Sequence, residues 1–175
     1  YRNLNDRTVD RVDQRKIDTV HGEFTLHTYT DRVSNSVHQA LTMGDIQADD
    51  PCLVRVQTIN TLRDVLGTER PGFKPSWSIR DAMARIAQEG KGVLVIVDQV
   101  ESKQDVLNQI EYFPEMPPMQ KGISESGVYR VVGAGSQMLR DLGVGKMRLL
   151  SSPIRYNAIS GFDLEVVEYI ENEGQ

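Results

Sequence analysis

The alternation of apolar and polar positions along the chain predicts a series of short β-strands. Apolar and polar side chains alternate from Glu23 to Tyr29, which is typical of a strand with one buried face. Residues 93–97 are apolar throughout, as expected for a strand that is buried on both faces. Similar patterns, bounded by turn-forming residues, predict further strands over residues 37–43, 52–59, 147–150 and 164–169.

Helical spacing of apolar residues predicts helices between the later strands. Ser78 and Asp81 have the spacing of a capping box, and Gly90 ends the apolar pattern that follows them. Another helical segment ends near Gly143. Because helices alternate with buried strands in the second half of the chain, we expect an α/β domain with three layers, α/β/α, around a mixed sheet.

A further helix is predicted after the apolar strand at 93–97. Ser102 and Asp105 mark its N-terminus, and the pattern continues to Tyr112. Its apolar residues fall at helical spacing, so we expect them to face the core: Val106, Leu107 and Ile110.

Residues 1–18 differ from the rest of the chain because they are rich in charge and poor in apolar anchors. This composition favours a solvated linker or arm, helical or not, that leads from an upstream domain. The chain begins at Tyr1 rather than at methionine, in keeping with an upstream part. We therefore expect the folded domain to occupy residues 19–175.

Composition narrows the functional classes. The 175 residues carry a net charge of −5, which argues against a nucleic-acid or membrane-surface partner. The apolar runs are too short to cross a bilayer, and no signal-like leader opens the chain. The single cysteine, Cys52, lies in an apolar segment and predicts a buried thiol in a reducing compartment. We expect a cytoplasmic protein.

Metal and nucleotide motifs are weak. His21, His27 and His38 are scattered, so they do not form a metal-binding pattern with Cys52. The glycine pair within residues 131–136 resembles a dinucleotide-binding turn, but Met138 takes the place of the third glycine. Small residues that let a helix pack closely are the favoured interpretation. Four arginines either converge on a phosphate or lie apart on the surface: Arg130, Arg140, Arg148 and Arg155.

Several blocks of sequence, taken together, resemble one known family. The longest reads Gly-Ala-Gly-Ser-Gln-Met-Leu-Arg-Asp-Leu-Gly-Val at residues 133–144. In this order the blocks resemble the GTP cyclohydrolase II domain of riboflavin biosynthesis, over nearly the whole chain from Asp18, and imply its fold. The other blocks lie at residues 19–24, 40–46, 54–56, 86–92, 147–150 and 164–167.

The resemblance fails where the family performs its chemistry. In that family, three cysteines after the strand that carries Arg55 hold zinc, whose bound water opens the imidazole ring of GTP. Residues 57–77 contain no cysteine in this chain. The resemblance therefore implies a degenerate domain with no metal site, no zinc and no GTP cyclohydrolase II activity.

Four positions keep side chains that suit a nucleotide or another phosphorylated ligand. Gln99 remains from a Gln-Glu-Gly-Arg segment, and Arg155 supplies a cation where the family has a lysine-containing loop. Arg130 matches the arginine that meets the α-phosphate, but Val128 replaces its aspartate partner. No catalytic residue is expected, and the ligand-binding candidates are Arg55, Gln99, Arg130 and Arg155.

In many bacteria this domain follows 3,4-dihydroxy-2-butanone 4-phosphate synthase, a magnesium-dependent lyase, in one fused protein. The resemblance implies an inactive C-terminal domain with a structural, dimerising or regulatory role. Its expected partners are the upstream synthase domain, which would use the magnesium, and a second copy in a homodimer. Two alternatives stay open: a sensor for a nucleotide or phosphorylated metabolite, and a residual phosphohydrolase that uses Arg130.

Overall fold

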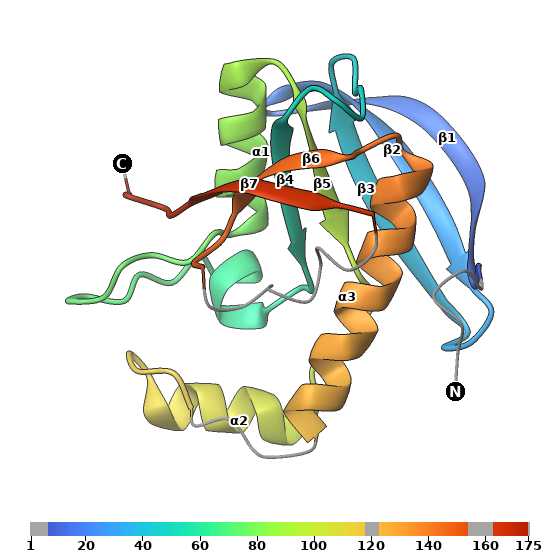
Figure 1. The fold of residues 1–175 in the computed structure, drawn as a ribbon. Coiled ribbons are helices and arrows are strands. Elements are labelled where there is room, and N and C mark those ends of the chain that lie inside the picture. The colour runs from blue at the N-terminus through green and yellow to red at the C-terminus, as the bar shows by residue number, and fades with distance from the viewer. Residues whose placement is uncertain (1–6, 118–122, 154–162, 175) are drawn as a thin grey trace.

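The computed structural model describes residues 7–117, 123–153 and 163–174, and a mixed seven-stranded sheet forms its centre (Figure 1). The strand order is β1-β2-β3-β5-β4-β6-β7. Neighbours from β1 to β5 pair antiparallel, whereas β5, β4, β6 and β7 are parallel to one another. The strands are β1 (Val9–Thr19), β2 (Gly22–Asp31), β3 (Ser36–Met43), β4 (Cys52–Gln57), β5 (Gly92–Ile96), β6 (Lys146–Leu150) and β7 (Glu165–Ile170).

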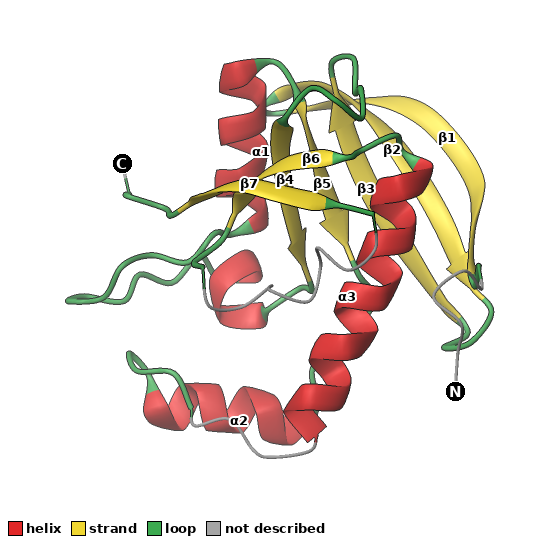
Figure 2. Cartoon of the chain, viewed as in Figure 1, coloured by secondary structure: helices red, strands yellow, loops and turns green. Residues whose placement is uncertain are grey.

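Helices cover both faces of the sheet, which confirms the three-layer α/β/α arrangement (Figure 2). The helix α1 packs on one face and α3 on the opposite face, while α2 projects from the end of the sheet. A short π-helix, η1, follows β4. The bounds are η1 (Thr61–Val65), α1 (Ile79–Glu89), α2 (Lys103–Tyr112) and α3 (Ile123–Asp141).

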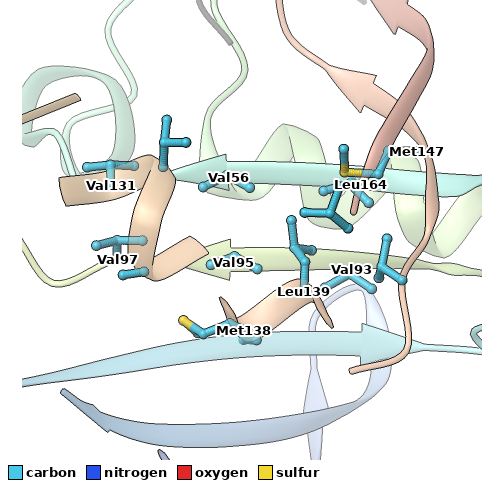
Figure 3. Packing of buried hydrophobic residues seen from close by; sticks show 14 of the residues in the cluster. Val56, Val93, Val95, Val97, Val131, Met138, Leu139, Met147 and Leu164 are labelled. Carbon is cyan, nitrogen blue, oxygen red and sulfur yellow. The ribbon is translucent and has the colours of Figure 1, made fainter. Parts of the chain in front are cut away.

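The larger core lies between α3 and the sheet (Figure 3). Met138 and Leu139 of α3 pack against alternate residues of the central strands, including Val56 and Val95. The smaller core lies on the other face, where Ile86 of α1 meets inward residues of β4 and β5. Because residues of β4 and β5 alternate between the two cores, these strands are buried on both faces, as the apolar run of β5 predicts.

The glycine pair in residues 131–136 lies inside α3 and not in a strand-to-helix turn. A Cβ atom on Gly135 would lie 2.9 Å from Cγ1 of Val56. Glycine therefore allows α3 to approach β4 closely. This geometry supports the packing interpretation and rules out a dinucleotide-binding turn.

The predicted helix N-termini are confirmed. The hydroxyl of Ser78 accepts a hydrogen bond from the Asp81 amide at 3.1 Å, and Gly90 ends α1 in the left-handed conformation with φ of 84°. Ser102 and Asp105 form a complete capping box at the start of α2.

The expected inward orientation of the α2 apolar residues is wrong for Leu107 and Ile110, whereas Val106 is half-buried. No residue of α2 is buried, and the side chains of Leu107 and Ile110 are 59% and 56% exposed. Periodicity identified an amphipathic helix correctly, but it does not show which neighbour covers the apolar side. Within the described residues, nothing packs over Leu107 and Ile110.

The expected linker at residues 1–18 is corrected for residues 9–18, which belong to the sheet. Most of β1 pairs with β2 from Val9 to Thr19, with an irregularity near Val12. The amides of Thr8 and Val9 also donate to Oε1 of Gln137 on α3, at 2.8 and 3.1 Å. An edge strand can keep charged side chains in solvent, so a charge-rich sequence was misread as an arm.

Candidate functional site

The carboxyl ends of the four parallel strands lie at one edge of the sheet. In open α/β sheets this edge is the usual place for a ligand. The segments that leave β4, β5 and β7 here line an open groove of about 1250 Å³. Its lining includes η1, the loop at residues 67–73, one side of α1 and the end of α2.

The loop after β4, where the family resemblance places its cysteines, is held by the carboxylate of Asp64. Asp64 accepts hydrogen bonds from the backbone amides of Asn60 at 2.8 Å and Ile79 at 2.9 Å. It also accepts from Nη2 of Arg63 at 2.7 Å and from Nε2 of Gln57 at 3.2 Å. Asp64 therefore joins β4, η1 and the start of α1.

The side chain of Asp64 is only 2% exposed. Burial raises the pKa of this carboxyl, but the hydrogen bonds from Arg63, Asn60 and Ile79 outweigh it and hold the pKa below its ordinary value. The carboxylate is thus ionised at neutral pH, and the groups around it are arranged to stabilise its negative charge.

A second carboxylate, Glu101, joins the same loop to α2. One of its oxygens accepts from the amide and hydroxyl of Thr61, at 2.6 and 2.8 Å. The other accepts from Nε2 of Gln109 at 2.6 Å, and Gln109 in turn accepts from Nδ2 of Asn60 at 2.8 Å. Polar side chains therefore form the contact between α2 and η1.

The side chains of the loop after β4 do not suit a zinc ion as ligands. Zinc sites of this kind need thiolates or imidazoles, and residues 57–77 contain neither. The carboxylates of Asp64 and Glu101 already accept hydrogen bonds from backbone and side-chain groups. No group of three histidine, cysteine, aspartate or glutamate residues suited to a metal occurs in the described part of the chain.

Arg55, a candidate for ligand binding, is buried on the α1 face of the sheet. Its Nε donates to Oε1 of Gln57 at 2.8 Å, and Nη1 and Nη2 donate to the carbonyl oxygens of Leu150 and Trp77 at 3.0 and 2.9 Å. The guanidinium group therefore links β4, β6 and the segment before α1. These contacts hold the guanidinium group within the fold of the protein.

The other candidates do not gather around Arg55. Gln99 is exposed on the loop after β5 and lines a separate, smaller groove with Ile59 and Val100. Arg130 is exposed on α3, and that helix packs on the face opposite to the Arg55 side chain. Arg155 lies outside the described residues.

The strand histidines have structural contacts. Nδ1 of His38 accepts from the amide of Asp98 at 2.9 Å, so Nε2 carries the proton and donates to Asp31 at 3.0 Å. His27 contacts the hydroxyl of Thr42 at 2.9 Å, and burial lowers the pKa of its imidazole. His38 lies beside the carboxyl end of β5, where Gln39 pairs with Ile96, but both of its ring nitrogens are engaged in these contacts.

Sequence patterns missed the two carboxylates that organise the site. Asp64 and Glu101 lie in loop-like segments, and no short motif identifies them. Their partners come from distant parts of the chain, including Ile79 and Gln109. Only the fold brings these groups together.

Comparison with known proteins assigns the family. Residues 10–171 match the sequence profile of GTP cyclohydrolase II. This chain belongs to the GTP cyclohydrolase II family. Relatives with curated names include proteins of riboflavin biosynthesis, and the loop after β4 in this chain contains no cysteine or histidine.

The relatives are longer than this member of the GTP cyclohydrolase II family. A 3,4-dihydroxy-2-butanone 4-phosphate synthase of Pseudomonas aeruginosa is 47% identical over 174 residues, covering 99% of this chain and 46% of that protein. The riboflavin biosynthesis protein RibBA of Aquifex aeolicus is 33% identical, covering 97% of this chain and 43% of that protein. The chain thus spans a little under half the length of these relatives.

A solved structure supports the same assignment. RibBX from A. baumannii, described as a two-domain 3,4-dihydroxy-2-butanone 4-phosphate synthase, superposes with a TM-score of 0.64 at 33% identity. The match covers 95% of this chain and 41% of that protein. Among the described residues, no helix has the length and apolar character needed to cross a membrane.

Proposed function

We propose that this chain is a non-catalytic GTP cyclohydrolase II-like half of a 3,4-dihydroxy-2-butanone 4-phosphate synthase. In this proposal it neither binds zinc nor opens the GTP ring. Its role is to support the synthase half, structurally or by regulation, in a cytoplasmic homodimer. The magnesium-dependent chemistry belongs to the synthase half.

The observation that carries the proposal is the loop after β4. In place of metal ligands it has the carboxylate of Asp64, which accepts hydrogen bonds from two backbone amides and from the guanidinium group of Arg63. Without a zinc ion there is no Lewis acid to lower the pKa of an attacking water. The same loop is tied to α2 through Glu101, so its polar groups serve the fold.

The names of the relatives support the assignment to a synthase. The P. aeruginosa protein, 47% identical, is named for the synthase reaction alone, whereas the A. aeolicus protein is named RibBA. A domain that has the family fold but lacks the metal ligands is suited to a structural or regulatory role. Fold by itself does not fix function, so activity has to be measured.

The test is incubation of the purified chain with GTP, with and without zinc and magnesium, followed by chromatography for formate, pyrophosphate and the ring-opened pyrimidine. We expect no product under any condition. Product that depends on added zinc would overturn the proposal. Pyrophosphate without ring opening, abolished by R130A, would instead establish the residual phosphohydrolase.

The supporting role is tested in the longer protein that carries both halves. A D64A substitution, which loosens this half without touching the synthase half, is expected to lower the thermal stability or the synthase rate of the whole protein. A D49A substitution in an exposed turn is the matched control. Unchanged stability and rate in the D64A protein would count against a supporting role.

A second candidate function is a sensor for a nucleotide or phosphorylated metabolite. The open groove at the carboxyl ends of the strands favours it, because the groove is lined by Arg63, Arg70 and Arg80. Arg63 is paired with Asp64, and Arg70 donates to the carbonyl oxygen of Pro114, so both cations already have partners. Calorimetric titration with GTP, ribulose 5-phosphate and riboflavin phosphate tests this function, and absence of heat and thermal shift would exclude these ligands.

A further inference from the structure

The helix α2 presents an apolar stripe to solvent. Leu107 and Ile110 are more than half exposed, although α2 is well formed and begins with a complete capping box. The opposite side of the helix faces the body of the protein, where Gln109 contacts Asn60 and Glu101. Figure 1 shows α2 at the end of the molecule, away from the sheet.

Charged residues flank the stripe at both ends. Lys103 lies four residues before Leu107, and Glu111 lies four residues after it. Residues that are three or four positions apart share one side of a helix, so Lys103, Leu107 and Glu111 line the exposed side together with Ile110. The order along the stripe is positive, apolar, negative.

This order opposes the dipole of the helix. Negative charge is favoured at a helix N-terminus and positive charge at a C-terminus. In α2, Lys103 occupies the first position and Glu111 the last turn. Asp105 also lies in the first turn, where its negative charge is favoured, but within the described residues neither Lys103 nor Glu111 has an ion-pair partner that would offset its own mismatch.

We propose that α2 pairs antiparallel with α2 of a second copy of this chain. A two-fold axis near Leu107 brings the two Leu107 side chains together, because Lys103 and Glu111 are equidistant from this residue. Lys103 of each copy then meets Glu111 of the partner subunit, and the two helix dipoles are antiparallel. This pairing resolves the charge mismatch and covers the apolar stripe.

A second copy fits the stripe better than an unrelated partner. Only a self-complementary contact requires opposite charges at equal distances from the centre of the helix. The inference rests on the self-association in the proposed function and identifies the surface that makes it.

Sedimentation equilibrium of the chain at low ionic strength tests the pairing. Each single reversal, K103E or E111K, puts like charges together twice in the dimer and should weaken self-association roughly tenfold. The double variant K103E/E111K restores opposite pairs and should return to about the wild-type affinity. D18K, at an exposed position of β1, is the charge control and should leave association unchanged.

The apolar centre is tested by L107D, which should also weaken self-association at least tenfold. V20D, at a turn position that is 95% exposed, is the matched control. Each single reversal improves the match to the helix dipole, so K103E and E111K should keep their helical circular dichroism and melting temperature. A loss of association in these variants therefore reports the interface and not unfolding.

A monomeric wild-type chain, a dimer insensitive to L107D and the single reversals, or failure of the double variant to recover would each overturn the inference. The non-catalytic and supporting roles in the proposed function are tested separately, by GTP turnover and by the effect of D64A on the synthase. A monomeric chain without GTP turnover would therefore remove the α2 interface and leave the non-catalytic assignment in place.

Discussion

Replacing Asp64 with alanine tests the role of this carboxylate in the loop after β4. The substitution removes the acceptor for the amides of Asn60 and Ile79 and for Nε2 of Gln57. A buried donor that loses its acceptor costs about 1–3 kcal/mol. Arg63 is partly exposed, and the groove beside the loop admits water, so some of these donors regain a partner.

We expect D64A to lower the free energy of unfolding by about 3 kcal/mol, toward the lower end of the summed cost. For a domain of this size that corresponds to a drop of roughly 6–12 °C in the melting temperature. Urea denaturation followed by circular dichroism measures the change, with D49A as control. A D64A variant within about 0.5 kcal/mol of the wild type would refute the structural role of Asp64.

The pH dependence gives an independent check on Asp64. The pKa of this carboxyl in the folded chain lies below its ordinary value of about 3.9. Its contribution to stability is therefore fully present above that pH and is lost as the pH falls through the folded pKa. The difference in stability between wild type and D64A should be constant near neutral pH and shrink below about pH 4.

Three further predictions concern the core. Gly135→Val should destabilise the protein by about 2 kcal/mol or more in urea denaturation, since a Cβ at this position would lie 2.9 Å from Val56. Tyr29→Phe removes the 2.8 Å hydrogen bond to Asp141 and should cost about 1–2 kcal/mol by the same measurement. Burial raises the pKa of the Cys52 thiol to about 11, so this cysteine should react with a thiol reagent at pH 8 only after denaturation. Wild-type stability in either variant, or rapid labelling of the native thiol, would contradict the packing described.

Local patterns predicted most of the elements because those elements are buried on defined faces. The apolar run of β5 and the capping residue Ser78 each have a local physical cause, and both are confirmed. β1 was missed because an edge strand tolerates charge on its exposed side, so its sequence lacks the usual apolar alternation. The orientation of α2 was missed because its neighbour is not encoded in its own periodicity.

The site was less predictable than the fold. The absence of cysteine at residues 57–77 was visible in the sequence, but what replaced the metal ligands was not. Asp64 accepts a hydrogen bond from the amide of Ile79, 15 positions later in the sequence. Glu101 accepts one from the amide of Thr61, which lies 40 positions earlier. The buried contacts of Arg55 likewise depend on β6 and the segment before α1, which no local pattern connects with it.

The measurement that tests the central claim most directly is zinc binding by the purified chain. The chain is equilibrated with zinc in competition with a chromophoric chelator, dialysed and analysed for metal, alongside D64A. The account predicts no stoichiometric zinc in either protein, because residues 57–77 offer no thiolate or imidazole and Asp64 is engaged in hydrogen bonds. One tightly bound zinc per chain that is lost in D64A would contradict it and would make this loop a metal site of a new kind.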